Sequence, residues 1–161
     1  MKTTHALGIA AAAGACGLVL SRLTRTVNAL DFYGKSVVIF GGSRGLGLEI
    51  ARQLSAAGAY LTLAARDAEE LERARVDLDD RGFSATTIPC DIRDRRDVEA
   101  AIQRVITEHG AIDVLINDAG VIQVGPVELM TVADFENAMA THFWGPLYAI
   151  LAALPHMRSP T

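Results

Sequence analysis

Residues 37–47, VVIFGGSRGLG, decide the fold predicted for this chain. The stretch opens with β-branched residues typical of a buried strand, meets a cluster of glycines, and leads into a pattern that places Ile50, Leu54 and Ala57 on one face of a helix. Such a turn binds phosphate, because glycines let the backbone approach an anion and the free N–H groups of the helix N-terminus point at it. A purely structural turn is the alternative, and the segments that follow decide between the two.

The composition is that of one α/β domain. The 161 residues are 50% hydrophobic and 6% aromatic, which is sufficient for a single domain with a substantial core. The formal net charge is -4 and no basic block is present, so nucleic acid is not an expected partner. Cys16 and Cys90 predict neither a disulfide framework nor a metal site, and Cys90 suits a reducing compartment.

A hydrophobic segment and linker at residues 1–30 precede the domain predicted at residues 31–161. Ala6–Leu20 carries no charge, and Arg22 and Arg25 follow it. The run is shorter than the roughly 20 apolar residues of a spanning helix. A cleaved signal, an uncleaved membrane anchor and a helix packed on its own protein are the three interpretations. We favour the anchor, with the two arginines keeping the domain on the cytoplasmic side of the membrane.

Strand-like and helix-like segments alternate from residue 35 onward. Strands are predicted at 35–40, 60–65, 84–88 and 112–116. Helices are predicted at 46–57, at 68–81 with carboxylates and arginines facing solvent, between Asp94 and Gly110, and from the Thr131/Asp134 capping box to about Leu154, with a kink at Gly145-Pro146.

This alternation with short connections predicts a Rossmann-type, doubly wound parallel sheet with right-handed crossovers and helices on both faces. Ligands of such sheets bind at the carboxyl ends of the strands, where the strand order reverses. The glycine turn, Arg66, Asp91 and Asn117 all fall at predicted strand ends. Their convergence favours a nucleotide site over a structural turn.

Three short motifs stand at these strand ends: FGGSRGLG at 40–47, CDI at 90–92 and NDAG at 117–120. In this order and spacing they resemble the short-chain dehydrogenase/reductase family, classical type. The family's pattern has T-G-x-x-x-G-x-G and N-N-A-G, so Phe40 and Asp118 are departures from it. The resemblance runs from about residue 35 to the end of the chain.

The resemblance implies that the glycine turn holds the pyrophosphate of a dinucleotide. Its glycines would allow the turn, the approach of the backbone and the close packing of the helix, and Ser43 and Arg44 would donate to phosphate oxygens. The residues of this turn expected to bind the cofactor are Gly41, Ser43, Arg44, Gly45, Leu46 and Gly47.

The other two motifs are implied to bind the rest of the cofactor. Asp91 would accept a hydrogen bond from the adenine amino group, with Ile92 against the ring; a turn or helix-capping aspartate is the alternative. Asn117, Ala119 and Gly120 would line the path to the nicotinamide ribose.

The end of the second strand favours NADP(H) over NAD(H). Enzymes that select NAD usually end this strand with a carboxylate, which repels a 2′-phosphate. Here Ala65 stands at that position, followed by Arg66, and Arg44 lies in the glycine turn on the same side. Two guanidinium groups can bind a 2′-phosphate. The alternative is that Arg66 is a surface cation beside Asp67.

The catalytic serine and the Tyr-x-x-x-Lys pair of the family have no counterpart here. The tyrosines and lysines of the chain are Tyr33, Tyr60, Tyr148, Lys2 and Lys35. His142 stands at the position of the family's catalytic asparagine, where it would relay protons or have a structural role. We therefore expect the cofactor-binding half of an oxidoreductase for a small-molecule carbonyl or alcohol. We expect this half to be inactive alone and the full-length parent to be a homo-oligomer.

Two other functions fit parts of the pattern. A non-catalytic dinucleotide-sensing or interaction module of the same fold accommodates the departures Phe40 and His142. A sugar-nucleotide epimerase shares the nucleotide-binding half, but the NDAG motif and the spacing of the glycine turn favour the dehydrogenase.

Overall fold

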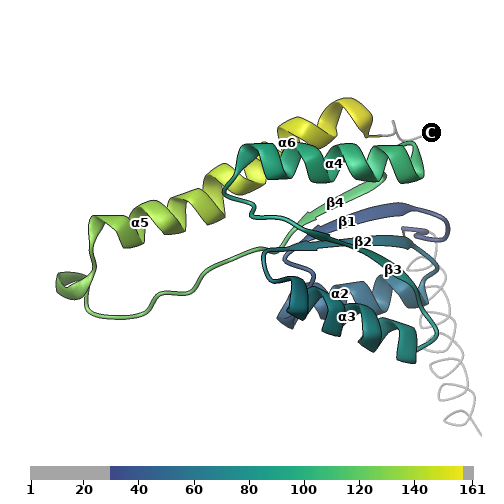
Figure 1. The fold of residues 1–161 in the computed structure, drawn as a ribbon, viewed down its shortest axis with the longest axis horizontal. Helices are drawn as coiled ribbons and strands as arrows, with labels where there is room; N and C mark the ends of the chain where they lie inside the picture. Colours follow the sequence, from purple (N-terminus) through teal and green to yellow (C-terminus); the bar gives the residue numbers. More distant parts are fainter. Residues whose placement is uncertain (1–29, 158–161) are drawn as a thin grey trace, which may run out of the picture. The chain divides into compact units, whose positions relative to one another are not determined.

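A parallel sheet of four strands organises the described part of the chain, residues 30–157 of a computed structural model (Figure 1). The strands are β1 (Ser36–Phe40), β2 (Tyr60–Ala65), β3 (Ala85–Pro89) and β4 (Val114–Asn117), in the order β3-β2-β1-β4. The chain builds outward from β1 to β3 and then crosses to the other side of β1. The strand order therefore reverses between β1 and β4, and the predicted Rossmann-type sheet is confirmed.

Helices cover both faces of the sheet (Figure 1). One face carries α2 (Gly45–Ala56) and α3 (Ala68–Asp80), and the other carries α4 (Arg95–His109) and α6 (Gly145–Ala153). All five residues of β1 are buried, because alternate side chains enter the two cores. Val37 and Ile39 join the α2–α3 cluster, whereas Val38 and Phe40 join the α4–α6 cluster.

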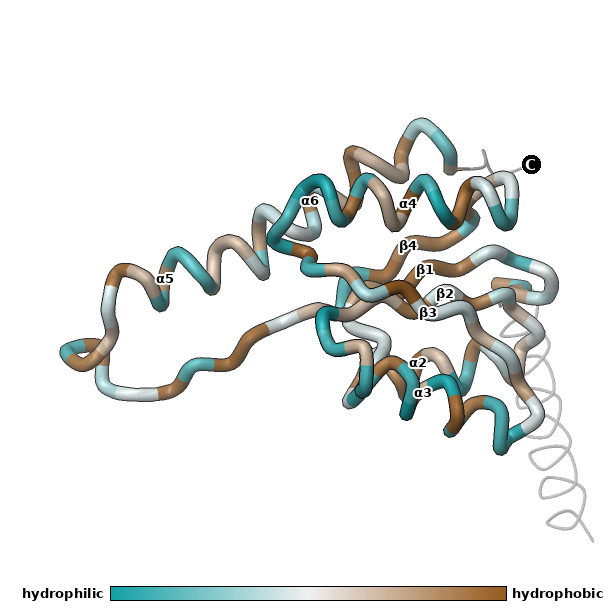
Figure 2. Tube along the Cα trace, in the orientation of Figure 1, coloured by the Kyte–Doolittle hydropathy of each residue, from teal (hydrophilic) through white to brown (hydrophobic). Residues whose placement is uncertain are grey.

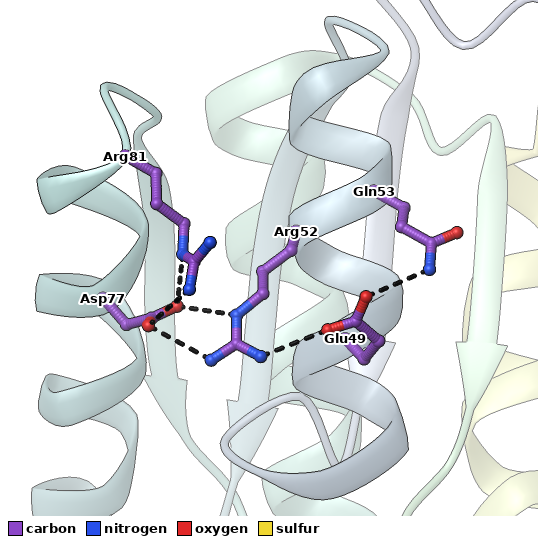
Figure 3. Close-up of polar contacts among 5 residues, drawn as sticks. All are labelled: Glu49, Arg52, Gln53, Asp77 and Arg81. Atoms are coloured by element: carbon purple, nitrogen blue, oxygen red, sulfur yellow. Dashed lines mark hydrogen bonds and ion pairs between the residues drawn. The ribbon is translucent and has the colours of Figure 1, made fainter.

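A charged network joins α2 to α3 on the first of these faces (Figure 3). Arg52 of α2 donates to both carboxylate oxygens of Asp77 of α3, at 2.8 and 3.1 Å, and also to Glu49 at 3.1 Å. Arg81 donates to Asp77 at 3.2 Å. The hydrogen bonds from Arg52 and then from Arg81 lower the pKa of Asp77 to about 2. Some of the charged side chains of α3 that were predicted to face solvent therefore form contacts between α2 and α3.

Three helices begin directly after the capping residues Asp67, Asp94 and Thr131, close to the starts predicted from the sequence. Asp67 accepts from the backbone N–H groups of Glu69 and Glu70, and Asp94 accepts from that of Arg96 at 2.8 Å. The Thr131/Asp134 capping box opens α5 (Val132–Met139). These side chains satisfy backbone donors that the first turn of a helix leaves free.

Two predicted elements differ in detail from the structure. The fourth strand begins at Val114 rather than at residue 112, because the pairing with β1 starts at Val37↔Val114 and Ile112 instead forms an isolated bridge with Met157. The last helix changes to a π-helical turn at Ala140–Trp144, ahead of the predicted kink at Gly145-Pro146. Pro146 has no N–H to donate to the carbonyl four residues back, which favours a widened turn at this place.

Large apolar side chains are exposed along the segment between β4 and α5 and along the final helices. Figure 2 shows the hydrophobic residues along the same segments. The most exposed in that segment are Ile122 at 93% and Val124 at 91%. These side chains belong to neither core cluster. Within residues 30–157 no helix is long and apolar enough to cross a membrane. The hydrophobic segment Ala6–Leu20 lies outside the described residues, and its role as an anchor stays a prediction.

Candidate nucleotide-binding site

A cavity of about 960 Å³ lies at the carboxyl ends of the strands. Its wall includes the last residue of β1, the end of β2 and the loops that follow β3 and β4. Ten of the predicted site residues line it: Gly41, Ser43, Arg44, Gly45, Leu46, Arg66, Asp91, Ile92, Ala119 and Gly120. Gly47, Asn117 and His142 are not part of its wall.

The glycine turn between β1 and α2 brings two parts of the backbone into close contact. Gly41 has a φ of +91°, and a Cβ atom there would lie 2.5 Å from the backbone nitrogen of Ala119. A Cβ on Gly47 would lie 2.3 Å from the carbonyl oxygen of Gly41. Both positions therefore require glycine, which explains how the turn fits between α2 and the NDAG segment.

The N-terminus of α2 differs from those of α3 and α4. Its N-cap residue is Arg44, whose extended backbone brings no capping side-chain hydrogen bond, whereas Asp67 and Asp94 cap the other two helices. The first N–H groups of α2 thus lack a side-chain acceptor among the described residues. A helix N-terminus in this condition, beside a cavity, suits an anion such as a phosphate.

Ser43 and Arg44 share one partner that the sequence analysis did not single out. The Ser43 hydroxyl donates to Oε2 of Glu70 at 3.3 Å, and Arg44 Nη1 donates to Oε1 of Glu70 at 3.3 Å. Glu70 comes from the first turn of α3 and lines the cavity. The solvent-facing position predicted for the α3 carboxylates is therefore wrong for Glu70, since its side chain is only 24% exposed.

Arg66 stands at the same cavity without a hydrogen-bonded carboxylate among the described residues. After the hydrogen bond from Arg93, which is the larger cause, the charge of Arg66 contributes to lowering the pKa of Asp91. Arg66 follows β2 directly and is exposed. Among the salt bridges between described residues, Arg44 takes part in one and Arg66 in none. The neighbouring Asp67 uses its carboxylate as the N-cap of α3. The guanidinium of Arg66 is thus placed where it can bind a second anionic group.

Asp91 lies in a turn closed by Arg93. Its carboxylate accepts from the backbone N–H of Arg93 at 3.0 Å, as in an Asx turn, and from Arg93 Nη2 at 2.6 Å. The side-chain hydrogen bond from Arg93 holds the pKa of Asp91 below its ordinary value. Arg93 also donates to Asn137 of α5 at 2.7 Å. The turn geometry weighed as the alternative for Asp91 is present, and the ionised carboxylate still lines the cavity.

Buried neighbours complete the wall beside Asp91. Cys90 is 4% exposed, and burial raises the pKa of its thiol to about 12, so it is protonated at neutral pH. Ile92 is also buried and packs under α6, where a Cβ on Gly145 would lie 2.8 Å from Ile92 Cγ1. Cys90 and Ile92 thus add neutral, apolar surface beside the charged Asp91 and Arg93, and such surface suits one face of a flat ring system.

His142 contacts the backbone of the segment that follows β4. Its Nε2 lies 2.8 Å from the carbonyl oxygen of Val121 and 3.3 Å from the N–H of the same residue. The shorter contact assigns a proton to Nε2, because one ring nitrogen cannot donate to the carbonyl and accept from the amide at once. His142 therefore holds Gly120 and Val121 in place.

Asn117 is the last residue of β4, and it is exposed to solvent.

The sequence has clear relatives among known proteins. The family described as short chain dehydrogenase matches residues 35–161. A fatty acyl-CoA reductase of Acinetobacter baylyi is 34% identical over 126 residues, which are 77% of this chain and 43% of that protein. Dehydrogenase/reductase SDR family member 7B of Danio rerio is 38% identical over 157 residues, 91% of this chain and 50% of that protein. The chain thus spans about half the length of these relatives.

A solved structure shares the fold. A blue fluorescent protein from a metagenomic library, in complex with NADPH, superposes with a TM-score of 0.72 at 33% identity. The match covers 80% of this chain and 53% of that one.

Proposed function

Because this chain belongs to the short-chain dehydrogenase family, a family of oxidoreductases, we propose that residues 31–161 are the NADP(H)-binding half of such an enzyme. The uncapped N-terminus of α2 at the cavity carries this proposal. A dinucleotide brings a pyrophosphate, and the glycine turn offers N–H groups and the positive end of a helix for it. The similarity to a structure in complex with NADPH supports the same ligand class.

Each part of the cofactor has candidate residues. The turn Gly41–Gly47 would hold the pyrophosphate, and Arg44 and Arg66 would bind the 2′-phosphate from two sides. Asp91 and Ile92 would bind the adenine, while the backbone from Asn117 to Gly120 would face the nicotinamide ribose. NADP(H), when bound, supplies or accepts the hydride. His142 would keep the segment beside the ribose in position, in addition to any proton relay.

The proposed substrate is a small-molecule carbonyl or alcohol. The serine and the Tyr-x-x-x-Lys pair that the resemblance calls for are not in this sequence. We therefore expect the 161-residue chain to bind the cofactor without turning over a carbonyl substrate. Homo-oligomerisation is expected for the full-length parent.

Selective loss of NADPH binding tests the proposal. In the double variant Arg44→Ala/Arg66→Ala, NADPH affinity should fall roughly 10- to 100-fold, because two charge-assisted hydrogen-bonding groups are lost. The loss for NADH should be much smaller. Calorimetric titration of both cofactors measures this. Arg95→Ala/Arg104→Ala removes two exposed arginines that pair with Glu99 and Glu108 outside this cavity, so it matches the loss of two positive charges. Equal losses for NADPH and NADH would contradict an NADP(H) preference.

A further inference from the structure

The Glu70 carboxylate lies against the glycine turn, where the proposed cofactor phosphates would bind. It reaches across from α3 to the loop before α2 and accepts from both Ser43 and Arg44. Ser43 itself is 8% exposed, so few other groups can reach its hydroxyl. One negative side chain therefore engages both side-chain donors that the turn offers to an anion.

The contacts of Glu70 are easily exchanged. Both measure 3.3 Å, at the long end for charge-assisted hydrogen bonds, and the Arg44 side chain is 78% exposed. The Arg44 end of this ion pair is open to solvent, and ion pairs that solvent screens in this way contribute little to stability. A phosphate monoester carries about -1.5 to -2 charge at pH 7, against -1 for a carboxylate. A phosphate can therefore displace Glu70 from Arg44.

The backbone of Glu70 is fixed, so only its side chain would move. Its N–H donates to the N-cap Asp67 at 2.9 Å, which anchors the first turn of α3. Arg66, which has no salt bridge among the described residues, is available to bind a phosphate first. The phosphate would then compete with Glu70 for Arg44 from a position already beside it.

We propose that Glu70 is an internal competitor that holds Ser43 and Arg44 until the 2′-phosphate of NADP(H) displaces it, so that Glu70 lowers the affinity for NADP(H). This inference rests on the proposed binding of NADP(H). Glu70 is thus a specificity-determining residue, because NAD(H) lacks the 2′-phosphate that would bind Arg44. Removing its charge should strengthen NADP(H) binding more than NAD(H) binding.

The test compares the full chain with Glu70→Gln, which keeps the shape of the side chain and removes its charge. Glu69→Gln is the matched control, because Glu69 is the preceding residue in the same turn, is 90% exposed and pairs with Arg73 instead. NADPH and NADH are titrated against all three proteins at low and at high salt. Thermal unfolding of each protein checks that the variants fold.

Glu70→Gln should bind NADPH about three- to tenfold more tightly than the unmodified chain, with a gain that shrinks at high salt as charges are screened. NADH affinity should change by less than about twofold, since no 2′-phosphate meets Glu70 there. Glu69→Gln should match the unmodified chain for both cofactors.

Three results would overturn the inference, and they differ from one another. If the unmodified chain binds NADPH and folded Glu70→Gln binds it equally or less well, Glu70 is not a competitor, although the proposed function stands. A selective loss of NADH binding would instead make Glu70 an acceptor for the ribose hydroxyls. If no form binds either dinucleotide, the proposed function fails and the inference fails with it.

Discussion

Gly47 in the first turn of α2 lies against the carbonyl of Gly41, so closely that a Cβ atom on Gly47 would come within 2.3 Å of that oxygen. Gly47→Ala should therefore destabilise the domain by roughly 1–3 kcal/mol, because backbone rather than a flexible side chain must move. Binding of NADPH should weaken as the turn is displaced. Urea unfolding and cofactor titration measure the two effects.

Gly125 offers the matched control for this substitution. A Cβ there would meet nothing within 4 Å, and its φ is not in the left-handed region. Gly125→Ala should leave both stability and NADPH binding close to those of the unmodified chain. If Gly47→Ala behaves like Gly125→Ala, the close contact between α2 and the glycine turn is not required.

The contact between His142 and Val121 predicts a positioning effect. His142→Ala removes one hydrogen bond to the Val121 carbonyl and should cost about 0.5–1.5 kcal/mol in the free energy of unfolding. Hydrogen exchange at the amides of Gly120 and Val121 should become faster, because the ring no longer holds this segment. His156→Ala, also an exposed histidine near the end of the described chain, should have neither effect. Unchanged exchange at Gly120 and Val121 would argue against this role.

The Asp77 network of Figure 3 predicts a pH-dependent contribution to stability. The folded-state pKa of Asp77 is lowered to about 2, chiefly by Arg52, against about 3.9 for an unfolded aspartate. The contribution is therefore fully present above about pH 4 and is lost as the pH falls to about 2. Asp77→Asn should lower the melting temperature at pH 7 and converge with the unmodified chain near pH 2.

Asp80→Asn makes the same charge change three residues further along, at the end of α3. It should show no comparable loss at pH 7. A difference in melting temperature between Asp77→Asn and the unmodified chain that stays constant from pH 7 to pH 2 would contradict this account. It would mean that ionisation of Asp77 does not stabilise the fold.

The elements that carry local signals are predictable from the sequence. The glycines after the strand at 36–40, the cap Asp94, the Thr131/Asp134 capping box and the apolar helix faces each act over a few residues. The sheet, its ligand-binding edge and most of the cavity wall therefore follow from them. The contacts of Glu70, and the contact of Arg93 with Asn137, do not follow from local signals, because these partners are remote in sequence. Glu70 meets Ser43 and Arg44 across 27 and 26 residues, and Arg93 meets Asn137 across 44. Only the packing of α3 beside α2, and of α5 beside the turn after β3, brings these pairs together.

The most direct measurement is an amide NMR titration of this chain with NADPH. The largest shifts should fall on the amides of Gly41–Gly47, with further shifts at Arg66, Asp91 and Ile92, because the pyrophosphate meets the open N-terminus of α2. Absence of binding at millimolar NADPH, or shifts that spare Gly41–Gly47, would contradict a dinucleotide site at this turn.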